Sequence, residues 1–149
     1  MSAALKNIAA IFSIFHDGTP EQWKWSENQL HLSVHCPYLA KMVDKDFNYF
    51  FLVLLDVDSF HVVPWVEQGE ETKKVYDLAE INVYDFEISH ANYSVDKVEV
   101  ICHEHSEVLN SSGASIYLSA QSYLIKTEDG QAISLDELDE LHMKYWEAG

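Results

Sequence analysis

The sequence predicts an α+β protein that consists mainly of an antiparallel β-sheet, open or barrel-like, with a helix near each end of the chain. Polar and apolar residues alternate over several short segments, which is typical of strands with one buried face. Two segments show instead the three- and four-residue spacing of amphipathic helices. Hydrophobic residues make up 48% of the 149 residues and aromatic residues 13%, enough for a core. Because no repeat, linker or low-complexity segment interrupts the chain, we expect residues 1–149 to form a single domain.

The N-terminal segment predicts a short helix packed on the sheet. Ser2 is a suitable cap, and the helix ends before residues 16–20, where Gly18 and Pro20 interrupt it. Apolar residues at helical spacing mark its buried side: Leu5, Ile8, Ala9, Phe12 and Phe15.

Two strands are expected next, joined by a polar turn at residues 26–29. The first has Trp23 and Trp25 on either side of Lys24. The second covers residues 30–36 and is closed by Pro37, and its even-numbered residues are all apolar. The alternating polar positions of this strand are His31, Ser33 and His35, which therefore share its solvent-facing side.

Residues 47–65 predict a hairpin. Residues 47–57 are apolar except for Asn48 and Asp56, which suits a central strand covered on both faces. Asp58 and Ser59 are expected to form the turn into residues 60–65. Residues 67–74 are charged and polar and predict an exposed loop.

Three further strands are expected at residues 84–89, 98–103 and 115–126, with a loop at 110–113. In the last of these, Ile116, Leu118, Ala120 and Leu124 are expected to share one face. Residues 128–130 form a hairpin turn that leads to a short extension at 131–133.

The C-terminal residues 134–146 predict an amphipathic helix docked on the body. Ser134 and Glu137 form a capping box, and Asp136 adds negative charge to the first turn. One stripe of the helix is expected to face the body: Leu135, Leu138, Leu141, His142 and Tyr145.

The charge of the chain restricts its partners. It has 9 Lys, no Arg and 25 acidic residues, for a net charge of −16. Nucleic acid is not expected as a partner, because binding to phosphate backbones requires a cationic surface. The acidic surface suits a basic protein, which a strong negative field would attract; the simpler alternative is that the charge serves solubility alone.

A cytoplasmic location is expected, because the sequence shows no membrane-spanning segment and no signal peptide. The longest early apolar run, residues 8–15, is too short to span a bilayer, and the start of the chain lacks the basic and apolar regions of a signal peptide. Two cysteines are too few for a disulfide framework, so Cys36 and Cys102 are expected to be buried free thiols.

Sequence motifs give little support to an enzyme. No Gly-rich phosphate loop, zinc-protease motif or paired Cys-x-x-Cys occurs, and no cofactor is expected. His103 and His105 would point to one face of a strand, as metal-binding His pairs do in some β-barrels. They keep open an alternative function: a small-molecule- or metal-binding β-barrel protein that uses a His-rich sheet face, with or without catalytic activity.

Polar and aromatic side chains on the solvent-facing side of the sheet are the better candidates for function. Tyr and His are frequent at protein interfaces because they combine rigid area with a polar group. A helix that covers this side, or a homodimer formed through it, is the competing interpretation. The candidate partner-binding residues are His31, His35, His103, His105, Tyr117 and Tyr123 on the sheet and Asp136, Asp139 and Glu140 on the last helix.

The layout also resembles that of the small acidic immunity proteins of bacterial toxin systems and of uncharacterised conserved cytoplasmic proteins like them. Three segments carry the resemblance: residues 15–18 (Phe-His-Asp-Gly), residues 36–39 (Cys-Pro-Tyr-Leu) and the final helix from Ser134 to Tyr145 and Trp146. The resemblance implies a non-enzymatic inhibitor that binds a basic toxin domain and blocks its active site. It assigns no functional residue.

Overall fold

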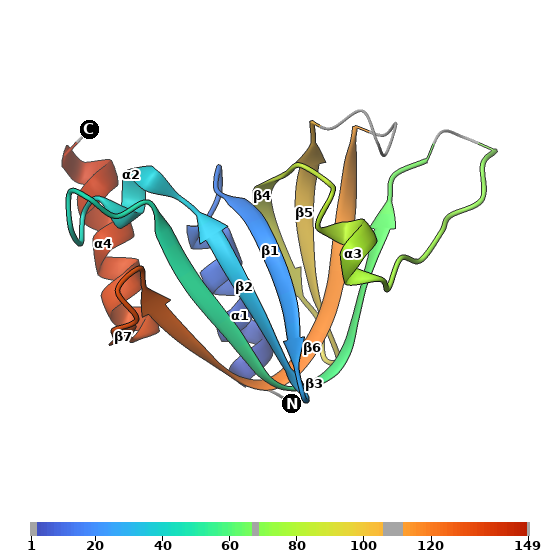
Figure 1. Ribbon diagram of the computed structural model, residues 1–149, viewed down its shortest axis with the longest axis horizontal. Coiled ribbons are helices and arrows are strands. Elements are labelled where there is room, and N and C mark those ends of the chain that lie inside the picture. Colours follow the sequence, from blue (N-terminus) through green and yellow to red (C-terminus); the bar gives the residue numbers. More distant parts are fainter. Residues whose placement is uncertain (1–2, 67–68, 106–111, 149) are drawn as a thin grey trace.

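Seven antiparallel strands form one sheet in the computed structural model, which describes residues 3–66, 69–105 and 112–148 (Figure 1). Within these residues the sheet is not closed into a barrel. Together with helices at both ends of the chain, it confirms the α+β class. In spatial order the strands are β1 (Thr19–Ser26), β2 (Gln29–His35), β3 (Tyr49–Pro64), β6 (Gly113–Thr127), β5 (Val98–Glu104) and β4 (Phe86–Tyr93), while β7 (Ala132–Ile133) pairs with the end of β6.

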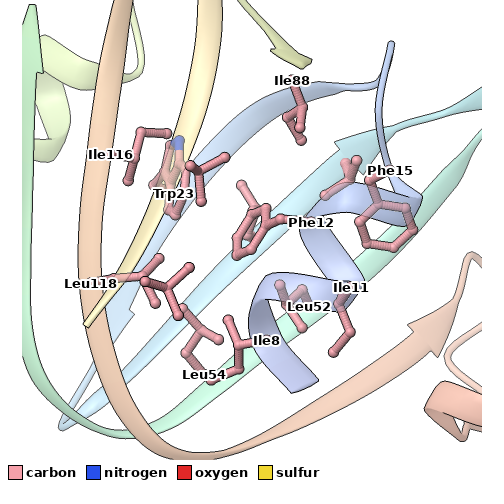
Figure 2. Packing of buried hydrophobic residues seen from close by; sticks show 14 of the residues in the cluster. Ile8, Ile11, Phe12, Phe15, Trp23, Leu52, Leu54, Ile88, Ile116 and Leu118 are labelled. Atoms are coloured by element: carbon pink, nitrogen blue, oxygen red, sulfur yellow. The ribbon is translucent and has the colours of Figure 1, made fainter. Parts of the chain in front are cut away.

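The sheet is bent around helix α1 (Ala3–Ile14), which lies against its concave side (Figure 1). Figure 2 shows Phe12 of α1 among side chains from several strands, including Leu54 of β3 and Leu118 of β6. The Phe15 ring packs on Phe50 of β3, with ring centroids 5.3 Å apart. The predicted buried stripe of the first helix is therefore confirmed.

Both edges of the sheet are bonded to other parts of the chain. At the start of β1, the Asp17 amide donates to the Ile88 carbonyl of β4 (2.8 Å), and the Ile88 amide donates to the Gly18 carbonyl (2.9 Å). Further along β1, the Asn82 side chain accepts from the Trp23 amide and donates to its carbonyl. These contacts satisfy backbone groups that an open sheet edge would expose to association.

The predicted hairpin at residues 47–65 is wrong. The segment is a single strand, β3, that pairs with β6 from Phe50 to Pro64. Asp56 has a φ of 51°, a left-handed conformation that Asp tolerates better than most residues, and the register shifts between Val57 and Ser59. Polar residues that resembled a turn in the sequence therefore mark a bend within one strand.

The same bend changes which residues of β6 face the core. Ile116, Leu118 and Ala120 are buried as predicted, but Leu124 is 43% exposed and Ile125 is buried. Tyr123, predicted to point away from the core face, instead lies opposite Leu54 and packs against the core. The prediction fails here because the two-residue alternation of β6 breaks between Ala120 and Tyr123, opposite the bend at Asp56.

Two short helices and several strand boundaries differ from expectation. The helices α2 (Pro37–Ala40) and α3 (Leu78–Ile81) were not predicted, and each is a single turn. β4 runs from Phe86 to Tyr93 rather than from residue 84 to 89, and β6 begins at Gly113, which was predicted to lie in a loop. Of the predicted loops, residues 69–74 are exposed, whereas 67–68 and 110–111, like Ser2, lie outside the described residues.

Helix α4 (Leu135–Ala148) agrees closely with its prediction. The Glu137 amide donates to Ser134 Oγ and the Ser134 amide donates to Glu137 Oε1, both at 3.0 Å, which is the predicted capping box. Leu138 is fully buried and fixes the helix to the body. None of the helices in the described residues has the length and apolar character that a membrane-spanning segment needs.

Candidate functional site

The outer face of the sheet, which is the side away from α1, holds most of the predicted candidate residues. On β2, buried Leu30, Leu32 and Val34 alternate with partly exposed side chains that point outward. The outward neighbours on β1 and β3 follow from the register: Lys24 and Val53 flank His31, while Thr19 and Tyr49 flank His35. His31 and His35 therefore share one solvent-accessible surface, as predicted.

A groove with two neighbouring lobes that share part of their lining runs over β1, β2 and β3 on this face. Gln22, Ser33 and Phe51 line both lobes. The larger lobe has a volume of about 570 Å³ and the smaller one about 330 Å³. We call them the acidic lobe and the basic lobe after the charged side chains that distinguish them.

The acidic lobe lies between β1, β3 and the segment that follows α3. Glu21 and Asp85 supply its carboxylates, and Tyr49 and Tyr84 supply its phenol rings. The Tyr49 hydroxyl donates to Glu21 Oε2 at 2.7 Å, which raises the pKa of Tyr49. Burial raises the pKa of Tyr84 to about 12, and its hydroxyl donates to Glu80. Both phenols stay neutral at physiological pH, so the charge of the acidic lobe is that of its carboxylates.

The basic lobe lies further along the same strands. Lys24 of β1 and Lys126 of β6 are among its lining residues, together with His31 and Val53. The His31 ring lies 3.1 Å from the side-chain oxygen of Gln29 and is held by it at the lobe. The groove is therefore polarised, with opposite charges in its two lobes.

A second cluster of rings lies on the outer face, over the other half of the bent sheet. His61 of β3, Tyr117 of β6 and Glu99 of β5 occupy one cross-strand row. The His61 ring stacks on Tyr117 with centroids 5.2 Å apart, and the exposed Tyr76 packs on His61 at 5.5 Å. The Tyr117 hydroxyl donates to Glu99 at 2.8 Å, and Lys97 lies over its ring. The prediction included Tyr117 but missed His61 and Tyr76.

His103 and His105 are both exposed, but the contacts that they make are different. His103 faces the edge of the Trp65 ring, whereas His105 lies beyond the end of β5 with Nε2 3.4 Å from Glu87 Oε1. Among the described residues, no group of three or more His, Cys, Asp or Glu side chains could hold a metal ion. Within the part of the chain that the structure describes, the pair therefore has no third side chain of these types to complete a metal site.

The acidic candidates form a separate surface on α4. Asp136, Asp139 and Glu140 are exposed, and Glu140 pairs with Lys144 at 3.1 Å one turn later. The nine predicted residues therefore occupy the outer face, the core side (Tyr123) and α4, and do not form one continuous site.

The structure also joins the three segments that carry the resemblance to immunity proteins. The Tyr38 hydroxyl donates to the His16 carbonyl at 2.7 Å, and its ring packs on Tyr145 at 4.7 Å. His16 Nε2 lies 3.4 Å from His142 Nε2, and the Trp146 ring stacks on His16 at 5.5 Å. We call these residues the His16 cluster. Only the four-residue spacing of His142 and Trp146 was visible in the sequence; their meeting with His16 depends on the fold.

Both cysteines are buried free thiols, as expected. Burial raises the pKa of Cys36 to about 11 and that of Cys102 to about 12, and Glu104 adds to the second shift. The thiolate is the reactive form, so neither residue is activated at neutral pH.

We expect no reaction of the native protein with Ellman's reagent at pH 8 and two reactive thiols in guanidinium chloride. A thiol that reacts in the native protein within minutes would contradict the burial of that cysteine.

Comparison with known proteins identifies no relative. No family model matches the chain, and neither a curated protein nor a solved structure resembles it significantly. The outer face itself offers carboxylates, phenols, imidazoles and amides that can form ion pairs, hydrogen bonds and ring contacts with a partner.

Proposed function

We propose that the protein is a non-enzymatic binding module that recognises a basic protein. An inhibitor of a bacterial toxin is the kind of module that the sequence resemblance implies. Recognition begins with long-range attraction by the acidic surfaces and is completed by contacts on the outer face. The observation that best supports this proposal is the combination of a net charge of −16 with rigid, partly exposed rings on one side of the sheet.

The rings of the outer face are held in place before a partner arrives. The Tyr76–His61–Tyr117 stack, the Tyr117–Glu99 hydrogen bond and the Tyr49–Glu21 hydrogen bond restrict their side-chain rotation. Binding then costs little conformational entropy at these positions, since a side chain that is already ordered has less freedom to lose. Aromatic side chains of this kind often dominate the binding energy of an interface.

The acidic field contributes mainly to the rate of association. Complementary charge raises association rate constants by up to about three orders of magnitude at low ionic strength. The exposed carboxylates of α4 add to this field even if they do not contact the partner. Their effect falls with added salt, because the Debye length shortens from about 10 Å at 0.1 M to about 3 Å at 1 M.

Salt dependence of a purified complex tests the proposal. A tagged sample captures partners from a lysate of the native organism at low salt, and the dominant basic protein is then purified and titrated back. We expect its affinity to fall at least tenfold between 50 and 500 mM NaCl, mainly through slower association. The matched variant D136N/D139N/E140Q removes three negative charges from α4 and should slow association while leaving dissociation unchanged. A complex of unchanged affinity over this salt range, or a dominant partner that is acidic, would overturn the proposal.

A further inference from the structure

The acidic lobe of the groove has the chemistry of a receptor for one basic side chain. We propose that it binds a lysine or arginine side chain that the partner protein presents to the outer face. This inference rests on the proposed function and specifies it, because it assigns the basic character of the partner to one position in the complex.

The size and the lining of the lobe suit a long side chain with a charged end. Its volume of about 570 Å³ lies within the range of small-ligand sites, and the smaller lobe continues from it along the strands. Phe51 and Tyr49 give it aromatic walls. The methylene groups of Lys or Arg pack well on such rings, and a guanidinium group also stacks on their faces.

The charges of the lobe favour a cation. Glu21 and Asp85 are both exposed and line it, and no lysine does. Tyr49 holds Glu21 in place through a hydrogen bond to Oε2, which leaves Oε1 available to a second donor. Within the described residues the Asp85 carboxylate makes no hydrogen bond or ion pair, while the Asp85 backbone is held by Glu104 and His105. One carboxylate held by a hydrogen bond and a second without a partner in the described part of the chain, beside aromatic walls, complement an ammonium or guanidinium group.

The neighbouring basic lobe determines which kind of group on the partner can lie beside that lysine or arginine side chain. Lys24 and Lys126 line this lobe, so a second cation directly beside the first would be repelled, and a neutral or acidic group would be favoured. A second copy of the chain fits poorly as the occupant, because two molecules of charge −16 repel each other. Charge complementarity therefore selects a basic partner over self-association at this groove.

Titration with a single amino-acid probe tests the lobe without the partner. The ¹⁵N-labelled protein is titrated with N-acetyl-arginine N-methylamide, and with the citrulline analogue as a neutral control of the same shape. We expect saturable amide shifts at Gln22, Ser33 and Asp85 with a millimolar dissociation constant, and at least tenfold weaker binding of the citrulline probe. The E21Q/D85N variant should weaken the arginine probe at least fivefold; the glutamine oxygen can still accept from Tyr49. The E70Q/E71Q variant removes the same charge from the exposed loop at residues 69–74 and should leave the affinity unchanged.

Three results would overturn the inference: equal affinity for both probes, shifts centred on α4 instead of the groove, or an unaltered affinity of E21Q/D85N. The comparison of the two probes uses the unmodified protein, so it decides the question even if a variant does not fold. Failure of this experiment is distinct from failure of the proposed function. If a basic partner still binds in a salt-dependent manner although the arginine probe fails, the proposed function holds and only the role assigned to the acidic lobe is wrong.

Discussion

Replacing Phe12 by Ala is expected to lower the free energy of unfolding by about 3–5 kcal/mol, the usual cost of removing a buried aromatic ring. Phe12 is fully buried in the concave side of the sheet, where strands from both halves of the bend surround it (Figure 2). Its removal leaves a cavity that rigid neighbours fill only in part. Since a domain of this size is stable by only about 5–15 kcal/mol, the variant should lose a large fraction of its stability.

Urea unfolding followed by circular dichroism measures this effect. The matched control is L124A, whose side chain points outward from β6 and is 43% exposed. We expect the control to cost less than about 1 kcal/mol, as is common for exposed positions. Equal losses for the two variants would mean that α1 is not the centre of the core.

The elements that the sequence predicts correctly are those in which one local rule is sufficient. The capping box at Ser134 and Glu137 depends on three consecutive peptide units, and the structure contains both of its hydrogen bonds. The alternation of β2 and the helical spacing of α1 are also uninterrupted, so burial follows the pattern of the residues. Propensity and packing agree at these positions.

The errors occur where long-range pairing overrides a local signal. Asp58 and Ser59 have the composition of a turn, but β6 pairs with β3 on both sides of them and keeps the strand continuous. The left-handed Asp56 accommodates the bend, and the altered alternation places Tyr123 on the core side. A bulge is specified by the partner strand as much as by its own residues, so one strand read alone does not reveal it.

Contacts between residues far apart in the sequence also limited the prediction of the candidate site. Alternation identified His31, His35 and Tyr117 as solvent-facing, because each lies in a regular stretch of strand. The acidic lobe escaped detection because Asp85 lines the same lobe as Glu21 only through the segment after α3, in which Asn82 is hydrogen-bonded to β1. The His16 cluster likewise joins residues more than a hundred positions apart.

Acidification is expected to release the last turn of α4 from the body. The indole N–H of Trp146 donates to His142 Nε2 at 3.0 Å, so that nitrogen must carry a lone pair and not a proton. Burial and the neighbouring His16 lower the pKa of His142, while Asp139 opposes the shift. Neutral His142 therefore stabilises the docked helix.

The sign of the pH effect is set by this shift. A group whose pKa is lower in the folded state binds more protons when the protein is unfolded, so the stability falls as the pH decreases. The stabilisation is complete above the ordinary histidine pKa of about 6.5 and is lost below it. The neighbouring His16 adds to the lowering of the His142 pKa, whereas Asp139 on α4 opposes it. Of the other groups around the two rings, Asp17 lies beside His16, and burial raises the pKa of Tyr38, which therefore stays neutral.

Nuclear magnetic resonance of the Trp146 indole group detects the release. Between pH 7.5 and 5.0 we expect its N–H signal to shift or broaden and the amide exchange of residues 141–147 to accelerate, while the amides of β3 and β6 stay protected. The H142Q variant keeps an oxygen that accepts from Trp146 but cannot be protonated, so its α4 should stay docked at pH 5.0. The matched control is H61F. Burial and two lysines also lower the pKa of His61, but this residue lies on the outer face, far along the sheet from α4. A Trp146 signal that is constant over this range, or an H142Q protein that responds like the unmodified one, would show that His142 does not control the docking of α4.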